Sequence, residues 1–506
     1  MPTATKKNPQ HEKNQLSIDA DRLIIATNRG PVEYFKTKEG TVKSRRGSGG
    51  VVTALTSTVS AVNATWVALA MTEGDREALK DAEDGVMPSP IRDINVRLRY
   101  VTVPKATYRK HYDMMSNRVL WFTQHYLLDQ ANGVFTSQQM QDAWEKGYYK
   151  VNQAIADAVS AEIESKDSKA LVMLHDYHLY LASAMIRKRH PSVAMQQFIH
   201  IPWPENRYWA SSLPTEMTKE IHQGLLGNDI LGFQTRGDAQ NFLNGVRAFF
   251  EDAEVDMDER FVVFEGHKTF VRDYPISISV SDERHLLQGV AGKRATENIK
   301  PFLNKYTLMR VDRIEPTKNI VQGFQAYDTL LEQHPDLHGQ ITFLAFLVPS
   351  RQSLPLYRKY QDETMKAIED INSKYGRKDW TPIHSFIQND RIAALAALQF
   401  YNVLLVNSLI DGMNLVAKEG AAVNTTDGVL VLSRTSGAFQ QLENAAIAIS
   451  PSNSNETAEA LYQALTLPAS ERKRLAESAR QEVEHNDLST WIAQQIDDVN
   501  NLLKTR

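Results

Sequence analysis

The sequence predicts an α/β protein built on two mainly parallel sheets, each covered by helices on both faces. Short apolar runs typical of buried strands alternate with longer amphipathic segments typical of helices. This alternation favours parallel sheets, because the chain must cross the sheet between two parallel strands and usually does so as a helix. A break at residues 272–283, where a strand ends at a proline and polar sequence follows, divides the alternation into two series.

The elements follow from these patterns in chain order. Apolar runs that end in polar residues predict first-series strands at 22–28, 171–178, 195–203 and 229–235. Helical spacing predicts a helix at 142–163. The second series has expected strands at 307–313, 341–348, 401–406 and 428–433, and an expected helix at 319–335.

Four segments are therefore expected along the chain. Residues 1–18 are polar, lack the apolar core of a signal peptide and are predicted to be a disordered tail. Residues 19–278 and 279–480 are expected to form two Rossmann-like domains that face each other across a cleft. Residues 481–506 contain a helix with apolar spacing, expected to pack back on the first domain.

Composition excludes several classes of protein. The 506 residues carry a net charge of −4, which gives no basic field for nucleic acid and no electrostatic membrane anchor. No apolar run approaches the roughly 20 residues of a membrane span. The chain has no cysteine, so disulfides and thiolate metal sites are excluded. These properties predict a cytoplasmic protein without membrane or nucleic-acid partners.

A glycine-rich stretch, "SRRGSGG" at 44–50, follows the first predicted strand. Its glycines would let backbone amides approach a ligand, and a helix predicted at 51–62 would offer its N-terminus to an anion. The stretch lacks the lysine and spacing of a P-loop. A plain flexible loop is the alternative.

Histidines and an aspartate end the next two strands of the first series. His175, Asp176 and His178 end one strand, and His200 ends the other. Polar residues at the carboxyl ends of parallel strands face the ligand crevice. They suit hydrogen bonding to sugar hydroxyls, with a metal site or a core histidine as alternatives. No compact ligand set such as H-E-x-x-H occurs, so no metal is expected.

Two stretches of the second series suit a nucleotide diphosphate. "RVDRIEPTKN" places Arg313 and Lys318 across a turn, where two cations can hold a diphosphate. A solvated surface loop is the alternative. In "NSLIDGMNLVAKEG", a strand delivers the chain to Asp411, and a helix is expected to begin near Asn414 with free amides for an anion. Ordinary capping explains part of this stretch, whereas Glu419 suits the hydroxyls of a ribose.

These stretches resemble the trehalose-6-phosphate synthase family, the retaining GT-B glycosyltransferases of family 20. The resemblance is carried by "NRGPV", "YDMMSNRVLW", "HDYHL", "HIPWP", "VDRIEPTKN" and "DGMNLVAKE", which occur in the family's order over roughly residues 22–500. The form "NRGPV…RRGSGG" is most similar to the actinobacterial-type branch. The resemblance implies the GT-B fold, with two Rossmann-like domains across a cleft.

The resemblance also implies the site residues. Arg313 and Lys318 would hold the donor diphosphate, Asp411 the transferred glucose and Glu419 the ribose. The other donor-binding residues would be Gly50, Gly412, Met413, Asn414, Leu415 and Val416. Glucose 6-phosphate would meet Arg29, Tyr112, Trp121, Asp176 and Arg351. His200 would lie near the reacting glucose, and the residues expected to act in catalysis are His200, Asp176, Arg313 and Lys318.

The implied activity is transfer of glucose from UDP-, ADP- or GDP-glucose to glucose 6-phosphate, giving α,α-trehalose 6-phosphate. No cofactor and no metal are expected, and a homo-oligomer is left open. Ile410 departs from the family pattern, which often has arginine before the Asp-Gly pair. The alternatives are a glucosylglycerol-phosphate synthase that uses glycerol 3-phosphate, a pseudo-glycosyltransferase of cyclitols, and a catalytically silent sugar-phosphate sensor.

Overall fold

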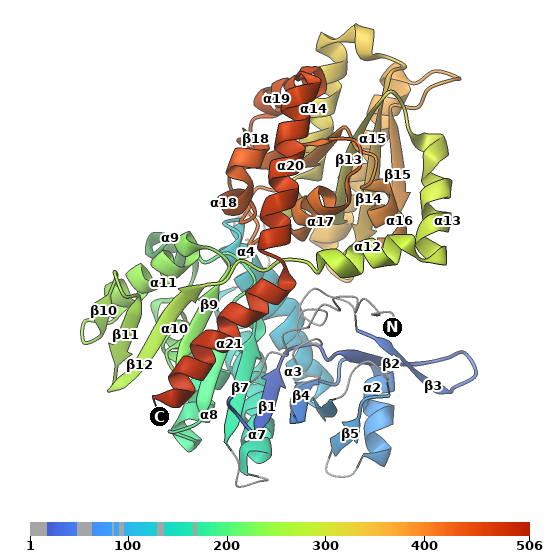
Figure 1. Cartoon of the computed structure of the whole chain (residues 1–506). Helices are drawn as coiled ribbons and strands as arrows, with labels where there is room; N and C mark the ends of the chain where they lie inside the picture. Colours follow the sequence, from blue (N-terminus) through green and yellow to red (C-terminus); the bar gives the residue numbers. More distant parts are fainter. Residues whose placement is uncertain are drawn as a thin grey trace, which may run out of the picture.

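Two sheets, one above the other in Figure 1, organise the chain. The computed structural model describes residues 18–47, 63–82, 85–90, 96–128, 136–164 and 169–505. Three predictions fall outside the described residues. They are Gly50 of the donor loop, the helix at 51–62, and residues 1–17 of the tail. Ile18, which the prediction placed in the tail, is instead buried in the core because its apolar side chain packs there.

The first sheet has ten strands among the described residues, and its central strands run parallel. Their order is β10 (Glu254–Asp256), β11 (Phe261–Phe264), β12 (His267–Asp273), β9 (Ile230–Phe233), β8 (Ala194–Phe198), β7 (Ala170–His175), β1 (Arg22–Ala26), β4 (Asn63–Leu69), β6 (Arg97–Val101) and β5 (Val86–Pro88). A separate antiparallel hairpin joins β2 (Val32–Lys36) and β3 (Val42–Arg46).

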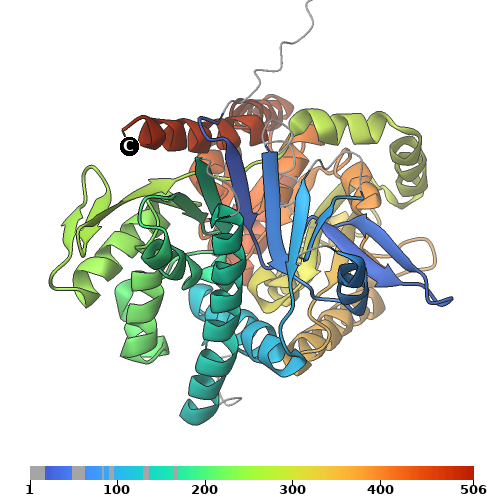
Figure 2. The ribbon, with the colours of Figure 1, turned by 90° about the horizontal axis from the view of Figure 1, so that it is seen from below.

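Helices cover both faces of this sheet. Along β1, Leu23 and Ile25 belong to the apolar cluster that includes α21 (Leu488–Lys504), whereas Ile24 packs with α7 (Lys150–Glu164). Seen from below, the red helix α21 lies on one side of the strands and the long teal helix α7 on the other (Figure 2). The alternation of side chains along a buried strand requires this arrangement.

The second sheet consists of parallel strands. Their order is β15 (Ile383–Ile387), β14 (Ile341–Pro349), β13 (Tyr306–Ile314), β16 (Val403–Val406), β17 (Val429–Ser433) and β18 (Ala446–Ile449). One face packs on α14 (Ile320–Gln333) and α19 (Ser454–Thr466), and the other on α16 (Arg391–Ala397) and α17 (Leu415–Val423). The parallel α/β class and the predicted strands of both series are confirmed, as is the helix expected at 319–335.

The other α-helices connect the strands, apart from the last one named here, which follows the final strand. In the first half they are α2 (Glu73–Ala78), α3 (Lys105–Arg109), α4 (Trp121–Gln124), α6 (Ser137–Ala143), α8 (Ala182–Arg189), α9 (Asn206–Ser212), α10 (Thr215–Leu225) and α11 (Arg236–Phe249). In the second half they are α12 (Val280–Gln288), α13 (Val290–Ile299), α15 (Pro355–Tyr375), α18 (Phe439–Leu442) and α20 (Ala469–His485). A π-helical segment, η3 (Lys110–Leu120), joins α3 to α4.

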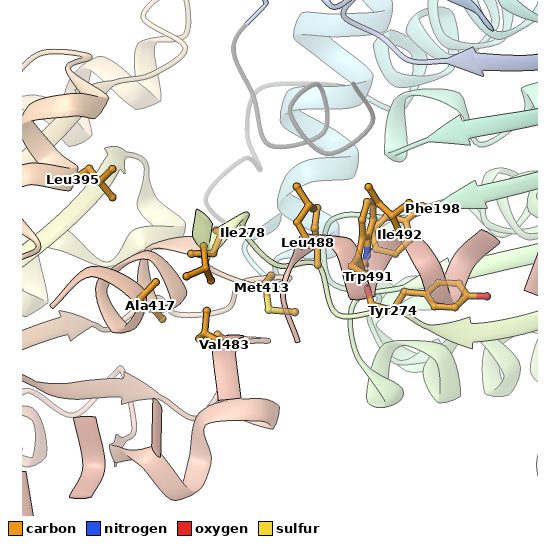
Figure 3. Packing of buried hydrophobic residues seen from close by; sticks show 14 of the residues in the cluster. Phe198, Tyr274, Ile278, Leu395, Met413, Ala417, Val483, Leu488, Trp491 and Ile492 are labelled. Atoms are coloured by element: carbon orange, nitrogen blue, oxygen red, sulfur yellow. Dashed lines mark hydrogen bonds between the residues drawn. The ribbon is translucent and has the colours of Figure 1, made fainter. Parts of the chain in front are cut away.

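The chain passes between the two sheets twice, at neighbouring places. The first passage follows β12, and the second lies between α20 and α21. The peptide N–H of Leu488 donates to the carbonyl oxygen of Ile278 at 2.9 Å, which joins the two passages. Around them one apolar cluster runs from Met413, in the loop between β16 and α17, to Phe198 of β8 and Trp491 of α21 (Figure 3). Among the described residues, no helix is long and apolar enough to cross a membrane.

Candidate active site

Two loops of the second sheet bring Lys318 and Asp411 together. Lys318 ends η7 (Pro316–Lys318), the single turn after β13, and Asp411 lies between β16 and α17. Lys318 Nζ donates to Asp411 Oδ2 in an ion pair of two largely buried side chains. Burial raises the pKa of Asp411, but the ammonium of Lys318 outweighs this effect and holds the pKa below its usual range. The pair therefore keeps a cation and a carboxylate charged side by side.

A fully buried arginine, Arg310 of β13, fixes both loops. Its guanidinium donates to the carbonyl oxygen of Lys318 at 3.1 Å and to that of Ile320 at 3.2 Å. It also donates to Asn407 Oδ1, at the end of β16, at 3.2 Å. A planar group with five donors can hold several acceptors in one arrangement. Arg310 thus explains why Lys318 and Asp411 meet.

The helix predicted near Asn414 begins there. Asn414 is the N-cap of α17, and its Oδ1 accepts a hydrogen bond from the peptide N–H of Ala417 at 3.3 Å. Leu415 and Val416 are the first helical residues, whose N–H groups precede the intrahelical hydrogen bonds. The carbonyl oxygen of Met413 accepts from Ser436 Oγ at 2.8 Å. Asn414 Nδ2 donates to Asp411 Oδ2 at 3.2 Å, so this helix start lies next to the Lys318–Asp411 pair.

One buried carboxylate, Glu315, joins Arg313 to Arg351. Its Oε1 lies 2.9 Å from Arg313 Nη1 and 3.5 Å from Arg351 Nη1. Burial opposes ionisation of Glu315, but the two guanidinium groups lower its pKa to about 2. Both arginines also lie over the ring of Trp121, with Cζ at 4.2 Å from the ring centroid for Arg351 and 5.6 Å for Arg313. A predicted donor residue and two predicted acceptor residues thus share one cluster.

Arg313 lies inside a strand rather than at its end. The strand predicted at 307–313 stops at Arg313, but β13 continues to Ile314 because it stays paired with β14 as far as Pro349. The side chain of Arg313 is 48% exposed, whereas that of Glu315 is fully buried. Arg313 is therefore open to solvent, whereas the side chain of Lys318 is 13% exposed.

Gly412 packs against the backbone at the end of β8, where a loop of the second sheet meets one of the first. A Cβ atom on Gly412 would lie 2.3 Å from the carbonyl oxygen of His200. Such a distance is far below van der Waals contact, so any side chain would push the Asp411 loop away from the end of β8. The glycine lets Asp411 and His200 belong to one site.

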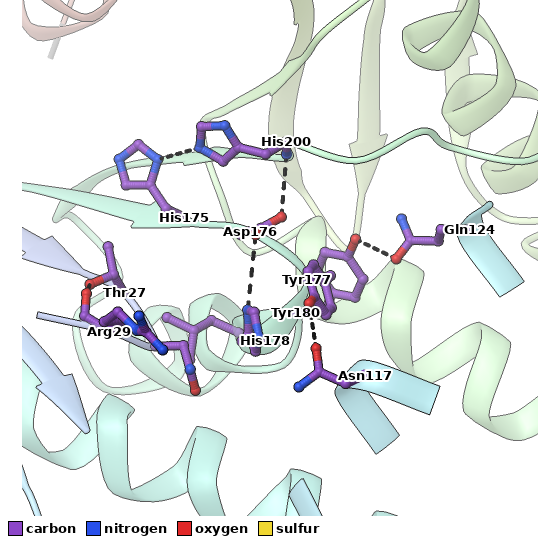
Figure 4. Close-up of polar contacts among 12 residues, drawn as sticks. Thr27, Arg29, Asn117, Gln124, His175, Asp176, Tyr177, His178, Tyr180 and His200 are labelled. Carbon is purple, nitrogen blue, oxygen red and sulfur yellow. Dashed lines mark hydrogen bonds and ion pairs between the residues drawn. The ribbon is translucent and has the colours of Figure 1, made fainter. Parts of the chain in front are cut away.

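On the first sheet, Asp176 follows β7 in a strained backbone conformation. Its φ is 73° and its ψ is 173°, a region that residues other than glycine rarely adopt and that costs about 1–3 kcal/mol. Its Oδ1 accepts from the peptide N–H of His200 at 3.4 Å, and its Oδ2 lies 4.0 Å from His178 Nδ1 (Figure 4). Burial raises the pKa of Asp176 to about 7, although Arg351 and Arg313 oppose this shift. Strain and a shifted pKa at one residue mark a functional position.

The histidines around Asp176 are neutral. His175 Nδ1 and His200 Nε2 lie 3.3 Å apart, so one ring donates to the other (Figure 4). Burial lowers the pKa of His175 to about 3, and burial together with His175 lowers the pKa of His200 well below its usual value. His178 is held neutral in the same way, by burial first. These rings offer hydrogen bonds rather than charge.

Arg29 and Tyr112 lie on the other side of His178. Tyr112 stacks on His178 with ring centroids 5.9 Å apart and on Tyr108 at 5.3 Å. Arg29 is drawn beside His178 in Figure 4, and its charge reduces the pKa of that imidazole together with the charge of Arg351. The predicted acceptor residues therefore gather around the loop that begins at Asp176.

Sequence reasoning missed His125, which caps α4. Its ring stacks on Trp121 with centroids 4.2 Å apart, and its Nδ1 lies 2.7 Å from the carbonyl oxygen of Trp121. A carbonyl only accepts, so Nδ1 carries the proton and Nε2 keeps a lone pair. Burial lowers the pKa of His125 to about 4, and the charges of Asp411 and Lys318 reach the ring. In the sequence, the one sign of this contact is that His125 follows Trp121 by four residues in "WFTQHY".

Glu419 lies apart from the cations of the diphosphate loops. It is on α17, and its Oε1 is 3.9 Å from Arg391 Nη2 of α16. Burial raises the pKa of Glu419 to about 7, and the neighbouring carboxylate of Glu283 adds to the shift. Ile410 is half-buried in the loop between β16 and Asp411. The structure therefore brings the described donor candidates to the loops around Asp411 and the acceptor candidates to the loop after β7, and it places Glu419 about one and a half helical turns along α17.

Within the described ranges, no group of three or more His, Asp or Glu side chains could hold a metal ion. The metal alternative drawn from His175, Asp176, His178 and His200 thus finds no support in their arrangement. The expectation that the protein needs neither metal nor cofactor remains a prediction.

Comparison with known proteins assigns the family. The profile of glycosyltransferase family 20 matches residues 21–501. The chain belongs to glycosyltransferase family 20. It is therefore a glycosyltransferase enzyme, and the GT-B fold expected from the resemblance is confirmed.

Proteins named as trehalose-6-phosphate synthases are similar to this chain over nearly its whole length. A trehalose-6-phosphate synthase of Klebsiella pneumoniae is 29% identical over 485 residues, covering 95% of each chain. A solved structure named as trehalose-6-phosphate from E. coli bound with UDP-2-fluoro glucose superposes with a TM-score of 0.81 at 27% identity, covering 95% of this chain and 99% of that one. A second solved trehalose-6-phosphate synthase, described with bisubstrate glycomimetics and transfer with retention, gives a TM-score of 0.78 at 27% identity, with 95% and 99% coverage.

Proposed function

We propose that this family 20 enzyme transfers glucose, with retention, from a nucleotide-diphosphate glucose to glucose 6-phosphate, forming α,α-trehalose 6-phosphate. The observation that carries the proposal is the meeting of two sets of residues. The Lys318–Asp411 pair from one sheet lies against His200 from the other through Gly412. The similarity to trehalose-6-phosphate synthases supports the same reaction.

The donor side suits a nucleotide diphosphate. Lys318 and Arg313 supply positive charge, and the first amides of α17 supply further donors for phosphate oxygens. When phosphate oxygens take the ammonium of Lys318, Asp411 is left to accept hydrogen bonds from glucose hydroxyls. Glu419, well inside α17, is left for the ribose. The donor would thus extend from Asp411 along α17.

The acceptor side suits a phosphorylated sugar. Arg351 and Arg29 supply cations for a phosphate, and Trp121 and Tyr112 supply aromatic walls for a sugar ring. Asp176, whose pKa lies at about 7, can accept a hydrogen bond from a hydroxyl of the acceptor. The neutral histidines beside it add hydrogen bonds without attracting a second phosphate.

The reaction needs charge stabilisation at the leaving group. As the bond from the anomeric carbon to the diphosphate oxygen breaks, Lys318, Arg313 and the helix amides stabilise the negative charge that develops. The acceptor hydroxyl forms the new bond on the same face, and its proton passes to the leaving phosphate oxygen. The paired carboxylates of a retaining hydrolase are then not required.

Product analysis tests the proposal directly. Purified protein is incubated with UDP-, ADP- or GDP-glucose and with either glucose 6-phosphate or glycerol 3-phosphate. We expect trehalose 6-phosphate from glucose 6-phosphate with at least one donor, and the preferred donor reports the effect of Ile410. Turnover of glycerol 3-phosphate alone, or of no acceptor, would refute the proposal.

Four further expectations are kept as proposals. The chain works without metal or cofactor, so EDTA is expected to leave turnover unchanged. The limits 19–278 and 279–480 mark two domains, with residues 481–506 assigned to the first, which limited proteolysis can check. The protein is cytoplasmic, which fractionation can check. Sedimentation of the pure protein can decide whether it is a homo-oligomer.

A further inference from the structure

A second carboxylate, Glu283 of α12, lies next to Glu419. The side chain of Glu283 is 6% exposed, and its Oε1 accepts from Arg391 Nη2. Its Oε2 is buried and has no hydrogen-bond partner among the described residues. A buried carboxylate with one unsatisfied oxygen is costly, so its position calls for an explanation.

One guanidinium serves two carboxylates here. Arg391, at the start of α16, pairs with Glu283 and lies 3.9 Å from Glu419 Oε1. Lys418, the residue before Glu419, does not supply a second cation, because its Nζ donates to the carbonyl oxygen of Ile276 at 2.7 Å and to Gln441 Oε1 at 2.6 Å. Burial lowers the pKa of Lys418 to about 7, so it titrates in the same range as Glu419 in every variant compared below. The two acids therefore compete for Arg391.

Because Arg391 can neutralise only one of the two carboxylates, Glu283 and Glu419 share one proton below neutral pH. Burial and the neighbouring Glu283 raise the pKa of Glu419 and Arg391 opposes both effects, so that the pKa lies at about 7. The pKa of Glu283 is also raised, by burial first, and the neighbouring Asp282 adds to this. When two acids interact this closely they titrate as a pair. Near neutral pH, the pair changes from one negative charge to two.

We propose that Glu283 is a positioning residue for the donor site, which competes with Glu419 for Arg391 and so makes donor binding weaken as the pH falls below neutrality. The inference rests on the proposed function, in which Glu419 accepts hydrogen bonds from the ribose. An ionised carboxylate accepts from both hydroxyls of a ribose, whereas a protonated one has an O–H that must donate. The shared arginine thus couples donor affinity to proton concentration.

The test compares E283Q with the wild-type protein. Dissociation constants for UDP-glucose, whose diphosphate does not titrate near neutrality, are measured by calorimetry from pH 5.5 to 8.5 without acceptor. We expect the wild-type constant to rise up to tenfold for each pH unit below about 7, as one proton is linked to binding. In E283Q, Glu419 is the one carboxylate that can pair with Arg391. The rise then moves to lower pH, and at pH 6 binding is several-fold tighter than in the wild type.

The matched control is E297Q. Glu297 lies on α13, is 68% exposed and pairs with Lys300, so this variant makes the same Glu-to-Gln change away from Arg391. It is expected to keep the wild-type pH profile. UDP-glucose that lacks the 2′ and 3′ hydroxyls is expected to bind the wild-type protein without the rise below pH 7, a measurement that does not depend on folding of any variant.

Two results would overturn the inference. One is a wild-type pH profile in folded E283Q, and the other is an unchanged pH dependence with the dideoxy donor. Each leaves the proposed function intact as long as the wild-type protein forms trehalose 6-phosphate. Failure of the wild-type protein to turn over any nucleotide-glucose would instead refute the proposed function itself.

Discussion

Lys318 and Asp411 face each other as an ion pair, whereas His175 and His200, on the other sheet, face each other as two neutral rings. Both pairs are largely buried. On the second sheet, opposite charges lie close enough to outweigh burial, and Glu315 shows the same balance with two arginines. Among the described residues, His175 and His200 have no ion-pair partner, so burial lowers the pKa of both rings.

The difference teaches how one site can hold two unlike substrates. A diphosphate needs fixed charge, and charges kept in pairs are available without a change of protonation. A sugar with many hydroxyls needs hydrogen-bond donors and acceptors, which neutral rings and Asp176 supply. We therefore expect variants of the two sides to fail in different ways.

The largest effect is expected from variants of the charged side of the site, which consists of Lys318, Arg313 and Asp411. Lys318→Met removes the ammonium beside the leaving diphosphate, and loss of one such group typically costs about 10²–10³-fold in kcat. Because Asp411 then lacks its partner, thermal unfolding must show that the fold persists. Arg313→Ala gives a second variant from a half-exposed position and is expected to reduce kcat in the same direction.

A surface lysine provides the control for Lys318. Lys366 is 72% exposed and pairs with Asp370 on α15, so Lys366→Met is expected to leave kcat and KM unchanged. Wild-type turnover in Lys318→Met would remove Lys318 from the reaction.

Gly412→Ala is expected to have the next largest effect, because it separates the two sides. The new Cβ would lie 2.3 Å from the carbonyl oxygen of His200, so the Asp411 loop must shift. A displacement of about 1 Å can cost roughly 10²-fold in rate. Gly289→Ala, where the nearest atom is 3.4 Å from the Cβ, is the matched control and should retain activity. Equal activity of the two variants would contradict the contact.

Asp176→Asn tests the neutral side through pH. Since the pKa of Asp176 is about 7, the wild-type kcat/KM for glucose 6-phosphate should fall as the pH drops below 7. The variant should have a lower kcat/KM, by about 10-fold or more, because a hydrogen bond to a charged group contributes about 1.5–3 kcal/mol. Its profile should lack the step at pH 7. Persistence of that step in the variant would assign it to another group.

The smallest effect concerns stability. The folded-state pKa of Asp176 lies above its ordinary value, so ionisation costs stability that is lost progressively as the pH rises from about 4 to about 7. Asparagine does not titrate, so Asp176→Asn should melt above the wild type at pH 8, with a smaller difference at pH 5. Melting curves at the two pH values decide this.

Local signals in the sequence predicted much of this arrangement. Asn414 was predicted to start a helix, because a capping side chain follows a buried strand, and it is the N-cap. Asp176 and His200 were predicted at one crevice, because parallel strands bring their carboxyl ends to one edge. Such inferences need only residues that are near in sequence or equivalent along neighbouring strands.

Contacts between distant residues could not be predicted. Glu315 gave no sign that it would join Arg313 to Arg351, because that depends on how far β13 runs beside β14. Glu283 and Arg391 are 108 residues apart in the chain, and their meeting depends on the packing of α12 against α16. A pKa set by burial likewise follows from packing, which no motif records.

The central claim is that charged residues of one sheet bind the donor and neutral residues of the other bind the acceptor. The most direct test is binding of UDP-glucose, without acceptor, to Lys318→Met and to Asp176→Asn. Calorimetry at pH 8 separates donor binding from turnover. If the charged side alone holds the diphosphate, Lys318→Met should lose most of the affinity and Asp176→Asn should bind as the wild type does. Equal loss of affinity in both variants would contradict the account.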